Sequence, residues 1–172
     1  MPLLINTDVR PDNEIKQAMD EIIAYGMDTW KPLKFEGEYP TTGFGLSILR
    51  PRNVGIANDF WQMTVTTSFA DWINDTGGDN EIRLVTGVFN LTIDPGTSEL
   101  FPSANGLQMP YFNIEHLYAT SDVARAWLTK PFAVKDNNNV TIQAVGRVAG
   151  TERLGLMGHI IGKRSLLIDA TP

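Results

Sequence analysis

The sequence contains no cysteine, which excludes disulfide scaffolds, thiolate catalysis and cysteine-ligated metal sites. It has only two histidines, His116 and His159, and neither lies in an H-x-H or H-E-x-x-H arrangement, so the pattern does not indicate a zinc protease or a metal-loaded cupin. Serine nucleophile motifs are also missing, because neither G-x-S-x-G nor S-x-x-K followed by S-D-N occurs. The sequence therefore predicts no catalytic residue, no metal site and no cofactor.

Long apolar runs are lacking as well, since no stretch approaches the roughly 18 residues that a membrane-spanning helix needs. The N-terminal MPLLINTDVRP has a short apolar stretch before polar residues intervene, so we expect no secretory signal. Basic residues are outnumbered, at 14 lysines and arginines against 20 acidic residues. The net charge of −6 argues against a dedicated nucleic-acid binder.

The length of 172 residues and the hydrophobic content of 42% are nevertheless typical of one folded domain. Residues 12–26 are the segment with clear helical periodicity: Asp12 or Asn13 can cap its start, and Gly26 is placed to end it. A helix this short is unstable alone in water, so its apolar stripe must pack against its own domain or act as an arm on a neighbouring subunit. We expect an arm over 1–30 and one domain over 31–172. The stripe consists of Ile15, Ala18, Met19, Ile22 and Ile23.

Beyond Pro32 the hydrophobic pattern alternates, as it does in half-buried antiparallel strands. Turn chemistry separates the strands, and Asp94-Pro95-Gly96 predicts a hairpin, with Asn105-Gly106 a second turn signal. About eight short strands without intervening amphipathic helices indicate a β-sandwich or barrel. We expect strands within 61–69, 81–93, 109–114, 131–135, 140–148, 154–161 and 165–168, and one or two helical turns at 121–128.

Three carboxylates lie in or beside a glycine-containing turn, at Asp75, Asp79 and Glu81. Their spacing does not match the twelve-residue EF-hand loop, so a solvated turn and a calcium site both stay open. His159 lies in an apolar strand, which favours a core or interface imidazole over a catalytic base. Glu115 directly precedes His116, and neighbouring strand residues point to opposite faces, so the pair would not form a working dyad.

Two segments carry a resemblance, YFNIEHLYATSDVARAWLTKPFAVKDNNNVTIQAVG and TERLGLMGHIIGKR. Over roughly residues 80–165 the chain is similar in pattern to the small single jelly-roll coat proteins of icosahedral bacterial and archaeal viruses. The resemblance implies an all-β antiparallel sandwich of jelly-roll type with about eight strands, which here follows one short N-terminal amphipathic helix. It also implies subunits that tile a shell.

The first functional hypothesis is accordingly a virion structural protein that self-assembles, located in the virion. Its partners would be copies of itself and other virion proteins. Contact with an internal membrane is a further expectation, and no sequence-specific nucleic-acid binding is expected. A carbohydrate-binding or adhesive module that uses exposed tryptophans is the alternative, and a cupin-like enzyme that uses Glu115 and His116 is a third hypothesis. The candidate inter-subunit contacts are Ile15, Met19, Ile22, Ile23, Trp30, Trp72 and Trp127.

Overall fold

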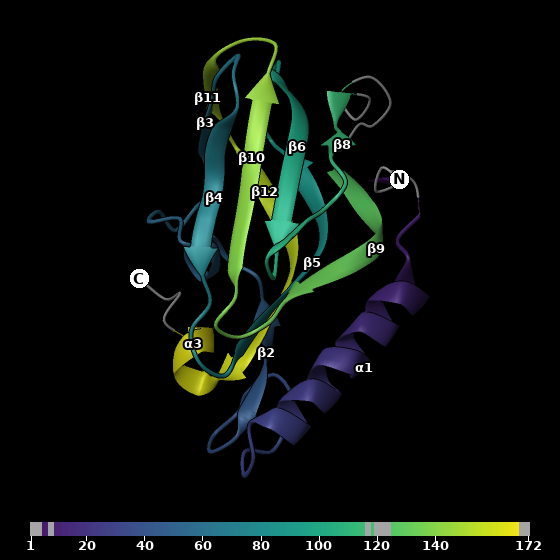
Figure 1. The fold of residues 1–172 in the computed structure, drawn as a ribbon, viewed down its shortest axis with the longest axis vertical. Helices are drawn as coiled ribbons and strands as arrows, with labels where there is room; N and C mark the ends of the chain where they lie inside the picture. The colour runs from purple at the N-terminus through teal and green to yellow at the C-terminus, as the bar shows by residue number, and fades with distance from the viewer. Residues whose placement is uncertain (1–4, 7–8, 116–117, 119–124, 169–172) are drawn as a thin grey trace.

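The computed structural model describes residues 5–6, 9–115, 118 and 125–168, and most of its regular structure is antiparallel β-sheet (Figure 1). The expected all-β class is confirmed. None of the helices in these ranges combines the length and the apolar character needed to cross a membrane. In chain order the elements are β1 (Ile5–Asn6), α1 (Asp12–Thr29), β2 (Phe44–Ile48), the 3-10 helix η1 (Pro51–Val54), β3 (Met63–Val65), β4 (Ala70–Thr76), β5 (Glu81–Asn90), β6 (Thr97–Ala104), β7 (Leu107–Gln108), β8 (Phe112–Asn113), β9 (Arg125–Val134), β10 (Asn139–Gly146), β11 (Gly150–Glu152), β12 (Leu154–Lys163) and α3 (Arg164–Ile168).

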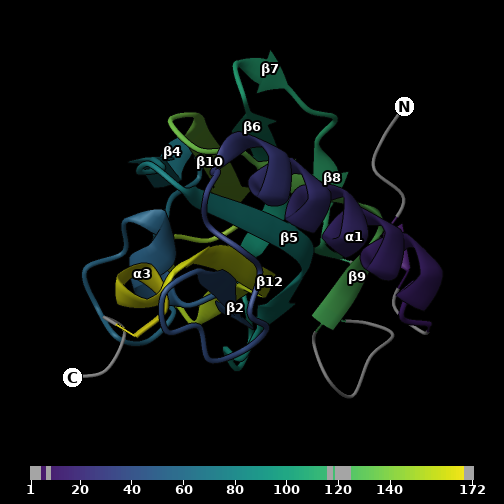
Figure 2. The same cartoon turned by 90° about the horizontal axis from the view of Figure 1, so that it is seen from below.

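The strands form two main sheets, which Figures 1 and 2 show as two layers. The first sheet has the order β1-β9-β5-β12-β2, and the second has the order β4-β10-β6-β7 with β8 also paired to β6. A small ribbon of β3 and β11 accompanies them. The antiparallel pairs are nested along the chain: β2 pairs β12, β3 pairs β11, β4 pairs β10, β5 pairs β9 and β6 pairs β8.

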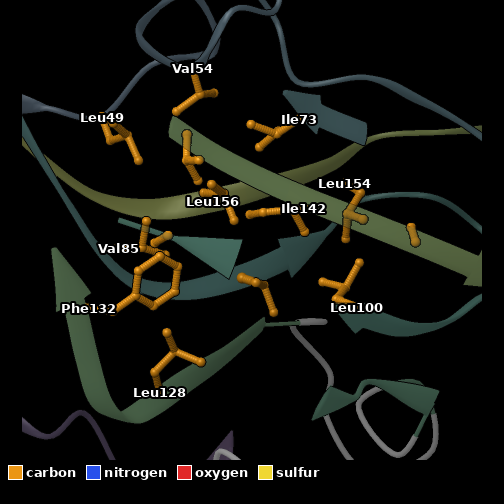
Figure 3. Close-up of a cluster of buried hydrophobic side chains, with 14 of the residues drawn as sticks. Leu49, Val54, Ile73, Val85, Leu100, Leu128, Phe132, Ile142, Leu154 and Leu156 are labelled. Atoms are coloured by element: carbon orange, nitrogen blue, oxygen red, sulfur yellow. The ribbon is translucent and has the colours of Figure 1, made fainter. Parts of the chain in front are cut away.

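The main hydrophobic core lies between the two sheets (Figure 3). The second sheet contributes Ile73, Leu100 and Ile142, each at most 1% exposed, and the first sheet contributes Val85 and Leu154 among others. Along β10 buried side chains alternate with more exposed ones, as the two-residue period of a strand requires. Burying one such aliphatic side chain stabilises the fold by about 1.5–3 kcal/mol.

The helix α1 packs on the opposite, outer side of the first sheet, against β9 and β5. A second buried cluster forms there from Ile22, Trp30, Phe44, Ile82, Leu84 and Ile161. Gly26 was expected to end the helix, but α1 continues to Thr29. Gly26 instead permits close packing, because a Cβ at this position would lie 3.0 Å from ring atoms of both Phe44 and Trp30. The division into an arm and a domain stays a prediction.

Several local expectations were wrong. Asp94-Pro95-Gly96 does not close a hairpin, because β5 and β6 belong to different sheets. Residues 125–128 belong to strand β9 instead of a helical turn, while 121–124 lie outside the described residues. The C-terminal segment 164–168 is the helix α3 instead of a strand, so the prediction of a single helix was incomplete.

Candidate functional site

The interface candidates on α1 face the protein's own first sheet. Ile15 and Ile22 are each 5% exposed and Trp30 is 4% exposed, while Met19 and Ile23 are half-buried. Trp30 also donates a hydrogen bond from Nε1 to Oδ2 of Asp136 at 3.0 Å, which ties the end of α1 to the turn after β9. These surfaces are therefore covered within one chain, and their contact with another subunit stays a prediction.

The two remaining tryptophan candidates are half-buried and lie on different sheets. Trp72 on β4 packs against the main core and meets Trp61 edge to face, with ring centroids 6.4 Å apart. Trp127 on β9 lies beneath Arg10, whose guanidinium carbon is 5.3 Å from the ring centroid. Both indoles are partly covered by their own chain, and their contact with another subunit stays a prediction.

The carboxylates Asp75 and Glu81 bind an arginine of the same chain. Arg83 lies almost fully buried, and its Nη2 is 2.6 Å from both Asp75 Oδ2 and Glu81 Oε1. Asp79 is exposed and instead accepts a hydrogen bond from Asn137 Nδ2 at 2.8 Å. Across the part of the chain that the structure describes, no three histidine, cysteine or acidic side chains gather into a metal-binding group.

A cavity of about 540 Å³ lies beside the edge strand β2. Its lining includes Tyr39, Ser47, Arg50, His159 and Arg164. Burial, together with the nearby charge of Arg10, lowers the pKa of His159, and its Nδ1 has no hydrogen-bond partner within the described residues. Glu38 also lines this cavity, and the core or interface role of His159 stays a prediction.

The proposed pairing of Glu115 with histidine is only partly visible. His116 lies outside the described residues. Glu115 is described, and its Oε1 lies 2.7 Å from Nε of Arg147. The carboxylate therefore has a cationic partner that the sequence analysis did not propose.

A buried carboxylate that sequence reasoning missed joins three segments at one end of the sandwich. Glu152 is 3% exposed. Its Oε1 accepts hydrogen bonds from the backbone N–H groups of Gly96 and Thr97, at 2.6 and 2.9 Å. Its Oε2 accepts from Thr97 Oγ1 and Asn90 Nδ2, both at 2.7 Å. This network fixes the crossing from β5 to β6, where the expected hairpin is absent.

Exposed aliphatic side chains lie on the two loops at this same end. Leu91 is 59% exposed, Ile93 is 90% exposed and Val148 is 66% exposed. The two loops contact each other, since Arg147 N donates to the carbonyl oxygen of Gly96 at 2.8 Å. We call Leu91, Ile93 and Val148 the end patch.

Three aromatic rings form a continuous strip on the second sheet. Phe69 and Phe101 meet edge to face at 4.7 Å between centroids, and Phe101 stacks with Tyr111 at 5.3 Å. Phe69 is 61% exposed, Tyr111 is 49% exposed and Phe101 is half-buried. We call these three residues the aromatic strip. It lies on the side of the sheet opposite the main core.

A row of polar side chains adjoins the aromatic strip. Phe101 on β6, Gln143 on β10 and Asp71 on β4 are consecutive cross-strand partners. Gln143 Nε2 donates to Asp71 Oδ1 at 2.8 Å, and Asn74 and Asn139 continue the row with a hydrogen bond of 3.3 Å between their amides. We call Asp71, Asn74, Asn139 and Gln143 the polar row.

Sequence reasoning missed the aromatic strip because it sought exposed tryptophans. A strand was expected within 61–69, but β3 ends at Val65 and Phe69 lies in the segment between β3 and β4. Phe101 carried a usable signal, since it alternates with the buried residues Leu100 and Pro102 along β6.

The sequence was compared with protein families and with curated proteins. Neither a protein-family model nor a curated protein matches the sequence.

Proposed function

We propose that this chain is a structural subunit of a virus particle, built on a jelly-roll sandwich and located in the virion. Its role would be structural, as a subunit of an assembly, and no catalytic role is proposed for it. Copies of itself and other virion proteins would be its partners. Contact with an internal membrane stays a prediction.

The nested strand pairing is the observation that carries the proposal. A jelly roll arises when one long antiparallel hairpin is rolled into two facing sheets, so that the outermost strands of the hairpin pair with each other and the innermost do the same. The pairs β2–β12, β4–β10, β5–β9 and β6–β8 follow this rule. The sheet orders β9-β5-β12-β2 and β4-β10-β6-β8 then follow from rolling that hairpin. Because this fold also serves lectins and enzymes, the assembly role needs a second argument.

The end patch supplies a surface for assembly. Its aliphatic side chains lie on two loops that contact each other and are 59–90% exposed. Their apolar surface is in contact with water, and binding to another subunit would bury it. The Glu152 network holds the loop after β5 in place, so the patch is a preformed surface. Association through a preformed surface loses little conformational entropy.

The test is the state of association of the purified protein, measured by light scattering and electron microscopy across protein concentration, salt and pH. Defined oligomers or shell fragments are expected. The double variant Ile93→Asp with Val148→Asp should dissociate them without changing the melting temperature. Leu107→Asp is the matched control, because Leu107 is also exposed, at 71%, but lies at the opposite end of β6. A strictly monomeric wild-type protein under all conditions would overturn the proposal.

A further inference from the structure

We propose that the outer face of the second sheet binds a neutral oligosaccharide, with the aromatic strip as its stacking surface and the polar row as its hydrogen-bonding partner. The inference does not depend on assembly, because it rests on side chains within one chain, carried by β4, β10 and β6 and by the residues directly before β4 and β8. It differs from the tryptophan-based alternative of the sequence analysis, since no tryptophan belongs to this surface.

The aromatic strip has the chemistry that one face of a pyranose requires. The C–H groups of a sugar ring carry partial positive charge and are attracted to the negative face of an aromatic ring. Phe69 meets Phe101 edge to face at 4.7 Å and Phe101 stacks on Tyr111 at 5.3 Å, so the three rings are in contact, and the more exposed Phe69 and Tyr111 at the two ends offer ring surface to a sugar. Each ring is fixed by its neighbour, and little side-chain entropy remains to be lost on binding.

The polar row has the chemistry that sugar hydroxyl groups require. Planar amides and carboxylates offer paired donors and acceptors, and adjacent hydroxyls on a sugar ring present the same pairing. Gln143 lies between Phe101 and Asp71 in register, so hydrogen-bonding groups begin where the aromatic strip ends. The bond from Gln143 Nε2 to Asp71 holds the amide in place, and within the described residues no hydrogen bond takes its Oε1 or its second N–H, so both can serve a ligand.

The charge of this face selects a ligand without negative charge. The segments 61–82, 97–113 and 139–146 carry the strip and the row, and they contain no lysine or arginine. Asp71 and Glu99 on the outward side of their strands add negative potential. Phosphate, sulfate and sialic acid would therefore meet no cation of these segments. A symmetric contact between two copies of the face would bring two sets of the same negative charges together without a lysine or arginine of these segments to offset them.

The experiment is an array of oligosaccharides built from neutral hexoses and N-acetylhexosamines, with sulfated and sialylated glycans beside them. The neutral oligosaccharide with the strongest signal is then titrated by calorimetry into wild-type protein and variants. Phe101→Ala and Tyr111→Ala should each weaken binding about tenfold or more, which corresponds to ~1.4 kcal/mol. Gln143→Ala should weaken it about threefold or more, as loss of a modest hydrogen bond predicts.

Tyr39→Ala is the matched control, because Tyr39 is 87% exposed and precedes β2 of the other sheet. It should leave the affinity unchanged, and thermal unfolding of every variant checks that the fold is intact. The absence of binding to every neutral glycan would overturn the proposal, as would preferential binding of sulfated glycans. If Tyr111→Ala reduces self-association while no glycan binds, the strip is a protein contact and the proposal is wrong. Failure of glycan binding with shells still forming leaves the assembly proposal intact.

Discussion

Replacing Ile22 by alanine tests whether the N-terminal helix belongs to the domain core or serves as an arm. The side chain is 5% exposed and packs in the cluster with Trp30, Phe44, Ile82, Leu84 and Ile161 on the outer side of the first sheet. Its truncation would leave a cavity between the helix and the sheet. Such a change costs about 2–5 kcal/mol, because transfer energy is lost and the surroundings collapse only in part.

For a chain of this size each 1 kcal/mol lowers the melting temperature by about 2–4 °C. A mid-range loss of ~3 kcal/mol should therefore lower the melting temperature of Ile22→Ala by roughly 6–12 °C. Circular dichroism during heating provides the measurement, and light scattering at 20 °C reports the state of association of the same samples.

Met27→Ala is the control for Ile22→Ala, since Met27 lies on the same helix and is 51% exposed. Its melting temperature should stay within about 2 °C of wild type, as expected for a surface substitution. The reasoning fails if Ile22→Ala melts like wild type but loses its oligomers. In that case the stripe contributes to contacts between subunits and little to the fold.

Two further substitutions test buried polar groups. Glu152→Ala leaves the buried donors of Gly96 and Asn90 without their acceptor, so the free energy of unfolding should fall by about 3 kcal/mol or more, read from the urea midpoint at unchanged slope. His159→Gln should flatten the pH dependence of stability. Burial lowers the pKa of His159 in the folded state, so the unfolded chain takes up its proton first, from about pH 6.5 downward, and wild type loses stability as pH falls. Parallel curves for wild type and His159→Gln between pH 7 and 5 would contradict this.

Elements with strong local signals were predictable from the sequence. The helix was predicted in the right place, and its stripe faces the sheet because the apolar spacing matches the helical period. The predicted cap was wrong, since Pro11 is the N-cap residue and Asp12 is already helical. Asn105-Gly106 forms the hairpin turn between β6 and β7, with positive φ of 54° and 75° at the two residues. Asparagine and glycine tolerate this backbone conformation, so the local chemistry decides the turn.

Pairing between distant strands was not predictable in the same way. Asp94-Pro95-Gly96 has turn chemistry, but a turn does not determine which neighbour the next strand pairs with. The sheet neighbours of β5 are β9 and β12, both far along the chain, so the 91–96 segment crosses to the other sheet. The carboxylate of Glu152 that holds this crossing also comes from a remote segment.

The aromatic strip was not predictable for the same reason, because it forms only when distant segments fold together. Phe69, Phe101 and Tyr111 come from three separate segments, and no spacing in the sequence relates them. Gly26 resembled a helix stop because glycine often ends helices. The helix continues through it because Phe44 and Trp30 occupy the space that a side chain would need.

The pairing of β2 with β12 has a consequence for synthesis on the ribosome. Phe44 is made early, while its partner Lys163 is made near the end, so β2 has no partner in its sheet until residues 154–163 have emerged. Closing so long a loop carries an entropic cost, and folds that depend on distant pairing form slowly. Incomplete chains therefore leave β5 with one open edge, which makes them targets for chaperones. The loop after β5 gains its hydrogen bonds to Glu152 only after this residue has been translated, so this end of the sandwich is among the last parts of the chain to become fixed.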